Sequence, residues 1–282
     1  MEVVALSQAV PRDRITTLRQ GTFHRNLNLV RELALTQFKL KYTGSVLGYL
    51  WSLMKPLMMF AVLYAVFARA LKLGSSSPHY TLQLLVGIVF WSFFAETVGA
   101  GVGVVVGNSG LLKKASFPRL VLVLASSVTS AMTFLINFAL ILIIAVPLKQ
   151  MEIGWRTLMV IPLILELYAL ILGLSLLLSS LFVVYRDLGH IWEISAQALF
   201  YGSAILFSLA PAFLGKKASW LALNPIAQIV EDVRHAAVTA RVPWTVQFTG
   251  GMFAVPLLIV AFTLGIGYFT FRRLTPRFAE YL

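Results

Sequence analysis

Four ionisable side chains lie in or near the long apolar stretches of this sequence: Lys55, Glu96, Glu166 and Glu193. An ionisable residue inside a membrane is costly, so by default it marks a functional position. Lys55 lies about ten residues into the first stretch, roughly 15 Å along a helix. It either lines an aqueous entry, pairs with Glu96, or extends its ammonium group to the membrane surface.

A polar group of a different kind, Tyr185, Arg186 and Asp187, interrupts two apolar stretches. A guanidinium suits bidentate contact with phosphate, so Arg186 is a candidate for meeting a lipid diphosphate or a partner protein. The alternative is structural, with Asp187 capping a helix that starts near Gly189 by accepting its unpaired N–H groups. The sequence does not decide between the two.

Catalytic and metal-binding motifs are absent from the sequence. The only Gly-Lys pair, Gly215–Lys216, lacks both the leading Gly and the trailing hydroxyl of a phosphate loop, and there is no H-E-x-x-H. The absence of cysteine excludes disulfides and thiolate metal sites. An enzyme that handles a phosphate leaving group usually has an acidic cluster for Mg²⁺, and here the acidic residues are scattered. We therefore expect no catalytic residue, no metal and no cofactor in this chain.

The composition indicates what must position these residues. The chain is 59% hydrophobic and 12% charged, against about 25% charged in soluble domains. Several apolar stretches exceed the roughly 18 residues that span a bilayer. The predicted fold is an all-α polytopic membrane protein with about six transmembrane helices. These are expected at Val46–Ala68, Leu82–Val106, Leu120–Val146, Leu158–Val184, Ile191–Leu209 and Phe253–Phe271.

Two further segments are not simple spans. Residues 24–42 have helical periodicity with a basic face, which is typical of an amphipathic helix lying in the membrane interface. Residues 210–243 are interrupted by prolines but too apolar for a free loop, which predicts a re-entrant pair of short helices before the last span. We divide the chain into residues 1–45, a cytosolic tail with the interface helix, and residues 46–282, the transmembrane domain.

The charge pattern bears on orientation and partners. The net charge is +12, but Lys and Arg flank the spans, so nucleic acid is not an expected partner. With six spans, fourteen Lys and Arg lie on the side of both termini and eight on the other. This excess places both termini in the cytoplasm.

Six segments together resemble the type-2 ABC exporter permeases that move O-antigen, teichoic acid, capsule or galactan. The first is KLKYTGSVLGYLWSLMKP (39–56), with Arg31 upstream. The others are GIVFWSFF (87–94), NSGLLKKASFPR (108–119), YRDLGH (185–190), Asn224–Pro225 and FRRLTPRFA (271–279). They occur in the family's order over nearly the whole chain. Lys55 departs from the family pattern, in which an uncharged polar residue is commoner before the proline.

The resemblance implies a homodimer in the bacterial cytoplasmic membrane, working with two copies of a separate ATPase that binds ATP and Mg²⁺. The implied cargo is a glycan on a polyprenyl diphosphate lipid. Residues 108–119 would contact the ATPase through Leu111, Leu112, Lys113, Lys114, Phe117 and Arg119, although composition alone favours an ordinary basic loop. The interface helix is a second candidate contact, with Arg25, Arg31, Lys39, Lys41 and Tyr42. Candidate substrate or gate residues are Lys55, Trp91, Phe94, Tyr185, Arg186 and Asp187, although aromatics in spans are by default lipid-facing or interfacial.

Two other functions fit the spans. A type-2 permease for a drug or simple lipid would be expected to lack the amphipathic lead-in and the KLKYTGSVLG-type segment. A membrane enzyme of envelope glycan assembly would be expected to show the missing acidic cluster.

Overall fold

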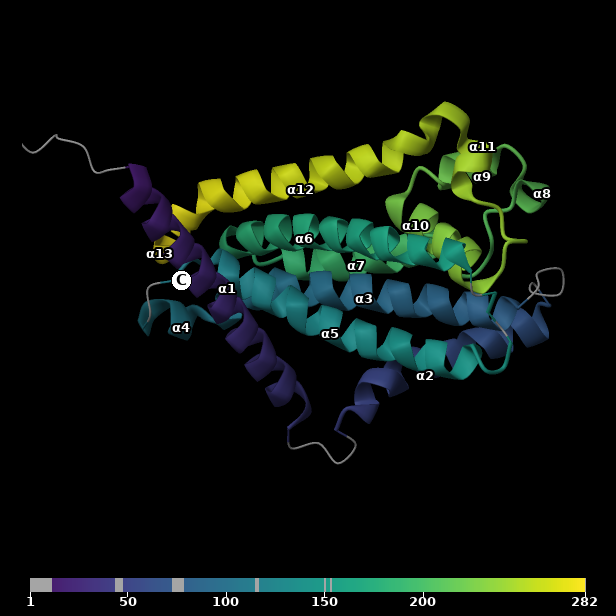
Figure 1. Cartoon of the computed structure of the whole chain (residues 1–282), viewed down its shortest axis with the longest axis horizontal. Helices are drawn as coiled ribbons and strands as arrows, with labels where there is room; N and C mark the ends of the chain where they lie inside the picture. Colours follow the sequence, from purple (N-terminus) through teal and green to yellow (C-terminus); the bar gives the residue numbers. More distant parts are fainter. Residues whose placement is uncertain are drawn as a thin grey trace, which may run out of the picture.

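The computed structural model describes residues 12–43, 48–72, 79–114, 117–149, 151–152 and 154–281, and every regular element in these residues is helical. This confirms the predicted fold class. Five helices are long and apolar enough to cross a membrane, and they run side by side along the molecule (Figure 1). Two of them are single helices, α3 (Tyr80–Gly107) and α5 (Leu120–Ala145). Two combine a pair of elements: Leu50–Ala70 consists of α2 (Leu50–Leu63) and η1 (Tyr64–Ala70), and Trp155–Val184 consists of η2 (Trp155–Met159) and α6 (Val160–Val184). The last, Thr245–Arg277, consists of α11 (Thr245–Thr249), η4 (Gly250–Phe253), α12 (Ala254–Leu274) and η5 (Thr275–Arg277).

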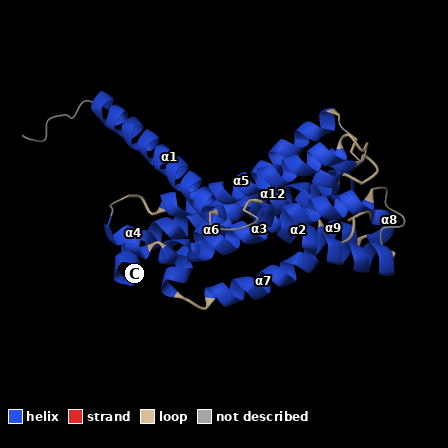
Figure 2. Cartoon of the chain, turned by 90° about the horizontal axis from the view of Figure 1, so that it is seen from below, coloured by secondary structure: helices blue, strands red, loops and turns tan. Residues whose placement is uncertain are grey.

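Of the six predicted spans, Ile191–Leu209 is the one that matches none of these five long helices. α7 (Leu188–Gly202), which lies along one side of the bundle (Figure 2), has 15 residues, about 22 Å of helix. Residues 203–210, which follow it, are not helical. The predicted helix Ile191–Leu209 is thus wrong over its last seven residues, 203–209. The reason is that three carbonyl groups there, those of Ala204, Ile205 and Phe207, accept hydrogen bonds from a buried arginine instead of from helical N–H groups.

α3 is the central helix of the bundle. It packs against α5, α6 and α7, and its buried residues form the main hydrophobic core together with the facing sides of those helices. Small residues permit the closest approaches. A Cβ on Gly101 of α3 would lie 2.8 Å from Ser175 of α6, and one on Gly267 of α12 would lie 2.1 Å from the Gly173 carbonyl oxygen of α6. These contacts hold α3, α6 and α12 together.

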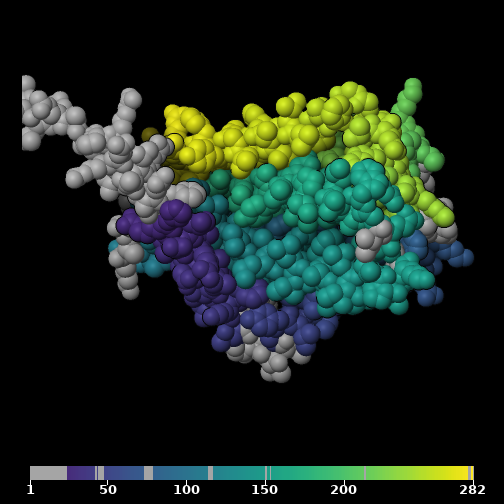
Figure 3. All heavy atoms as spheres, in the orientation of Figure 1, coloured from purple at the N-terminus to yellow at the C-terminus, as the bar shows by residue number. Residues whose placement is uncertain are grey.

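The predicted interface helix is longer than expected, and it is not only a membrane-surface element. α1 (Arg12–Tyr42) packs obliquely across one end of the bundle against α5 (Figures 1 and 3). Val30 and Ala34 of the predicted apolar face are buried, and the Thr129 hydroxyl of α5 donates to the Ala34 carbonyl at 3.1 Å. Leu27, on the same predicted face, is 54% exposed. Part of this face therefore contacts protein instead of lipid.

The two ends of the bundle differ in character. The α4 end carries α4 (Ser109–Lys114), the turn at 185–187 and α13 (Phe278–Tyr281). The α10 end carries α8 (Pro211–Leu214), α9 (Lys217–Leu221), α10 (Pro225–Val233), η3 (Arg234–Val238) and α11. α10 and η3 are almost entirely buried between α3, α6 and α12, which confirms that this segment is helical and packed in protein. It contains more short helices than the predicted pair.

Candidate functional site

At the α4 end, the residues of the segment 108–119 that are predicted to contact an ATPase point in two directions. Leu111 is 39% exposed and Lys113 is exposed, so both lie on the outer surface of α4. Leu112 and Phe117 instead pack against a second hydrophobic cluster formed by the ends of α3, α5, α6 and α12. The side chain of Lys114 lies outside the described residues. The segment thus has an anchored face and an outward face.

Arg119 does not belong to the outward face. Its Nη1 donates a hydrogen bond to the Thr275 carbonyl oxygen, and its guanidinium lies over the Phe278 ring at 5.7 Å. Phe278 is fully buried and packs edge-to-face on Phe271. Direct contact between Arg119 and an ATPase is therefore not supported in this conformation, because its side chain binds the C-terminal segment of its own chain.

The turn at 185–187 is exposed. Tyr185 is 63% exposed, and the Arg186 guanidinium stacks 5.5 Å above the Phe182 ring, which leaves its outer face accessible. Asp187 occupies the N-cap position of α7, but its side chain accepts no capping hydrogen bond. Of the two alternatives that the sequence left open, the structure therefore does not show the one in which the Asp187 side chain caps the helix. On α1, Arg25, Arg31, Lys39 and Lys41 are all exposed, and the side chain of Tyr42 is not described.

Lys55 pairs with Glu96, one of the arrangements that the sequence left open. Lys55 Nζ lies 3.0 Å from Glu96 Oε1, with the two side chains 74% and 34% exposed. Beside this pair, a pocket between α2, α3 and α5 is lined by seven polar residues: Ser52, Ser92, Glu96, Thr97, Ser130, Thr133 and Asn137. Asn137 Nδ2 donates to the Ser52 carbonyl at 3.1 Å. Lys55 is therefore held at the edge of a polar seam between α2 and the rest of the bundle.

The other ionisable residues of the spans lie elsewhere. Glu166 on α6 faces Gln228 and Asp232 of α10, and Glu193 on α7 is exposed and lies 3.8 Å from His190 Nδ1. No cluster of three or more His, Asp or Glu side chains able to hold a metal occurs in the described part of the chain.

The aromatic gate candidates are buried. Trp91 and Phe94 are 6% and 0% exposed, and they pack against Phe200 and Trp192 of α7. Neither ring presents a surface to a ligand in this conformation. They build the α3–α7 contact, and a substrate would reach them only after α7 moved.

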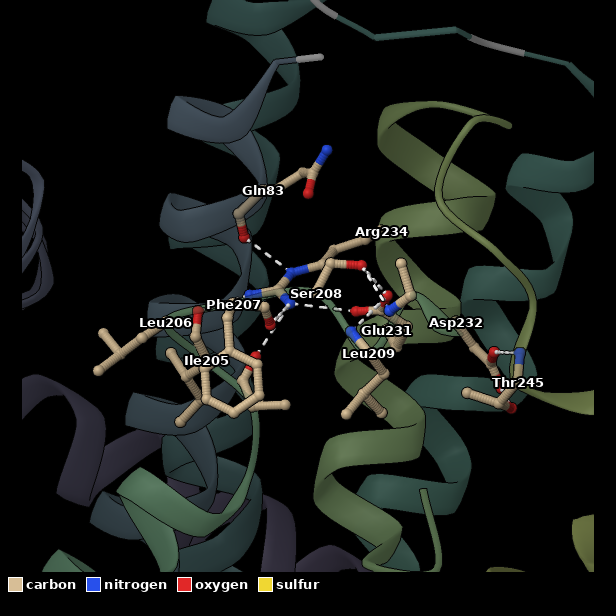
Figure 4. A network of polar contacts seen from close by, with 12 residues as sticks. Gln83, Ile205, Leu206, Phe207, Ser208, Leu209, Glu231, Asp232, Arg234 and Thr245 are labelled. Carbon is tan, nitrogen blue, oxygen red and sulfur yellow. Dashed lines mark hydrogen bonds and ion pairs between the residues drawn. The ribbon is translucent and has the colours of Figure 1, made fainter. Parts of the chain in front are cut away.

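The sequence analysis missed the most extensive buried polar network, at the α10 end (Figure 4). Arg234 is 2% exposed and donates to the carbonyl oxygens of Gln83, Ala204, Ile205 and Phe207 at 2.6–3.2 Å. It also pairs with the fully buried Glu231 at 3.2 Å. The network therefore satisfies the non-helical backbone after α7, as backbone inside a membrane protein requires.

The same network joins further elements. Glu231 Oε1 accepts hydrogen bonds from the Ser208 hydroxyl and, at 2.9 Å, from the Leu209 N–H. Arg234 is one of the eight Lys and Arg residues that the charge count assigns to the side opposite the termini, and its burial shows that this assignment is wrong. The available signal was the i, i+3 spacing of Glu231 and Arg234 in an apolar segment, which permits a pair on one helix face. Gly87 of α3 admits the guanidinium, since a Cβ there would lie 2.9 Å from Arg234 Nη2.

A smaller polar contact ties the loop before α6 to the end of η3. The Thr239 hydroxyl and the Ala240 N–H donate to Glu152 at 2.9 and 3.0 Å. The Ala240 hydrogen bond first, and then that of Thr239, hold the pKa of Glu152 below its usual value. The carboxylate therefore stays charged and keeps the two segments joined at neutral pH.

These helices are those of a polytopic membrane protein, and similarity to known proteins identifies its kind. Residues 28–238 match the family described as ABC-2 type transporter. The chain therefore belongs to this family, which makes it a membrane subunit of a transporter.

The relatives are similar over most of their length. An O-antigen export system permease protein of Klebsiella pneumoniae is 27% identical over 252 residues, 86% of this chain and 91% of that protein. Its counterpart in Myxococcus xanthus is 26% identical, over 76% of this chain and 82% of the relative. A polysialic acid transport protein of Escherichia coli is 22% identical, over 83% of this chain and 91% of the relative.

Proposed function

We propose that this chain is the membrane subunit of an ATP-driven exporter that moves lipid-linked polysaccharide across the bacterial cytoplasmic membrane. The observation that carries this proposal is the family match over residues 28–238, combined with three similar proteins named for O-antigen or polysialic acid transport. The bundle of apolar helices supplies the membrane domain that such a subunit needs.

The working assembly is a homodimer of this chain with two copies of a separate ATPase, which binds ATP and Mg²⁺. A two-fold symmetric ATPase dimer must act on two equivalent surfaces of its membrane partner. The homodimer is supported by the exposure of the first span, because only 6% of the residues in its apolar 18-residue stretch are buried within one chain. A charged Lys55 on that span needs protein or water near it, because exposure to lipid alone is costly.

The ATPase contacts the outward face of α4, where Leu111 and Lys113 are exposed, together with the basic residues of α1. Both termini lie in the cytoplasm in this arrangement. The cargo is a glycan on a polyprenyl diphosphate. The exposed guanidinium of Arg186 and the basic face of α1, with Arg25 and Arg31, bind the diphosphate, since guanidinium groups contact phosphate bidentately.

The test is to deplete this protein in its native cell, with a matched strain that expresses it from a second copy, and to locate the envelope glycan. We expect full-length lipid-linked polymer to accumulate inside the depleted cells, and its sugar composition would name the cargo. Normal glycan outside the cell would overturn the polysaccharide assignment and leave a permease for a drug or lipid. Loss of polymer synthesis without a trapped intermediate would instead indicate an enzyme of glycan assembly.

A further inference from the structure

The C-terminal segment folds back and contacts Arg119, the last residue of the segment 108–119. Arg119 directly precedes α5, whereas Thr275 and Phe278 follow α12, 156 or more residues later. We name the contact among Arg119, Thr275 and Phe278 the C-terminal clasp. Arg277, in the same segment, is exposed and takes no part in it.

The clasp joins a cation to a helix C-terminus. The last carbonyl groups of a helix lack intrahelical partners and carry partial negative charge, which a cation stabilises. Arg119 supplies this cation at the C-terminal end of α12, and the Thr275 hydroxyl donates to the Phe271 carbonyl at 2.6 Å. The end of α12 is therefore attached to the start of α5 by directional bonds as well as by packing.

Phe278 is a fully buried member of the hydrophobic cluster against which α4 packs. The cluster contains residues from the ends of α3, α5 and α6, and partly buried Leu33 of α1 and Leu112 of α4 pack against it. Protein interiors are close-packed and transmit strain from one element to the next. Phe278 and Arg119 therefore connect α1 and α4 to α12.

α12 runs the length of the bundle and is held again at the α10 end (Figure 1). The helical segment that leads into it begins at Thr245, whose N–H and hydroxyl both donate to Asp232 of α10, at 2.9 and 2.8 Å. Asp232 adjoins the buried Glu231–Arg234 pair. A series of packed and hydrogen-bonded elements thus connects α4 to the re-entrant segment.

We infer that the C-terminal clasp is the positioning device that transfers displacement of α4 to α12, so that Arg119 and Phe278 act inside this chain and not as contacts of the ATPase. The inference rests on the proposed function, since it assumes an ATPase partner at the α4 end. It goes beyond that function by assigning a transmission role to the C-terminal segment.

The absence of cysteine provides a clean test, because a single introduced cysteine is the only thiol in the chain. The reporter is Met252→Cys, at an exposed position at the α10 end, and the comparison site is Leu165→Cys on α6. Each is labelled with a maleimide in the purified complex, with and without a non-hydrolysable ATP analogue. Recovery of the ATPase with the chain tests the proposed function separately, before any labelling.

We expect the analogue to change the labelling rate at Met252→Cys, and Arg119→Gln to abolish most of that change while the ATPase still copurifies. Arg119→Lys should restore much of it, because the cation at the helix end is kept, and Arg277→Gln should have no effect. Thermal unfolding of each complex separates lost transmission from lost folding. Three outcomes would each overturn the inference. The labelling change could be the same in Arg119→Gln, it could be absent when the clasp residues are unchanged, or the ATPase could be lost from the Arg119→Gln complex.

Discussion

The first two spans have equal mean hydropathy. Within their apolar 18-residue stretches, however, 6% of the residues of α2–η1 and 67% of the residues of α3 are buried in this chain. α3 has α5, α6 and α7 around it, whereas α2 lies at the edge of the bundle and buries only Pro56 among its own residues. Hydropathy measures transfer from water and does not distinguish lipid from protein as the new environment. Two spans of equal hydropathy therefore differ in what holds them.

The space beside α2 fits this difference. Next to the polar pocket at Lys55 lies an apolar groove between α2, α3 and α5, and the two share Pro56, Val89 and Asn137 as lining residues. α2 is thus attached along a seam that packing does not close. We expect substitutions in α3 to affect folding strongly and substitutions in α2 to affect it weakly.

The largest effect is expected at the α3–η3 contact. Arg234→Ala leaves Glu231 buried without its partner, which should lower the free energy of unfolding by at least about 3–5 kcal/mol. Unfolding of the purified protein in detergent would measure it, with exposed Arg241→Ala as the matched control. Replacing both charges, as Glu231→Leu with Arg234→Met, should cost less than Arg234→Ala alone. Equal stability of Arg234→Ala and Arg241→Ala would contradict this account of the network.

A cavity test compares the two spans directly. Phe94→Ala in α3 removes a fully buried ring and should cost about 3 kcal/mol, the low end for such truncations. Met58→Ala in α2 removes a side chain that is 59% exposed, and it should change the same unfolding free energy little. Similar losses for both would show that α2 is packed as tightly as α3 in the purified protein.

Close packing is tested by adding atoms instead of removing them. Gly101→Ala places a Cβ 2.8 Å from Ser175 and should destabilise by about 1–3 kcal/mol. Gly103→Ala, on the same helix with no atom within 4 Å of its added Cβ, is the control. Adding Ser175→Gly to Gly101→Ala should recover much of the loss in thermal unfolding. A Gly101→Ala protein as stable as Gly103→Ala would place the α3–α6 contact elsewhere.

The smallest effect is expected for the ion pair that links the two spans. The Lys55–Glu96 coupling free energy should be about 0–1 kcal/mol, because both groups are partly exposed. A double-mutant cycle with Lys55→Met and Glu96→Gln measures it. A coupling of several kcal/mol would show that this face of α2 is dry in the purified protein, which would remove the contrast with α3 at this position.

The sequence by itself determined the class and most of the spans. Tyr80–Gly107 was expected at Leu82–Val106, and Leu120–Ala145 at Leu120–Val146, because long apolar stretches end where charged or turn-forming residues begin. The six family-like segments and the interrupted composition of 210–243 pointed to the family and to a buried helical segment, and both were found. Local composition suffices for the spans, since each depends on only about twenty neighbouring residues, whereas the family resemblance depends on the order of six segments along the chain.

Only the tertiary structure decided the direction and the partners of individual side chains. Arg234 binds backbone as distant as Gln83, Arg119 binds Thr275, and Trp91 is covered by α7. None of these contacts has a local periodicity, because each joins segments far apart in sequence and depends on how helices pack. The same arginine side chain serves a solvated surface or a buried network according to the carbonyl groups around it, and the fold alone brings those groups together.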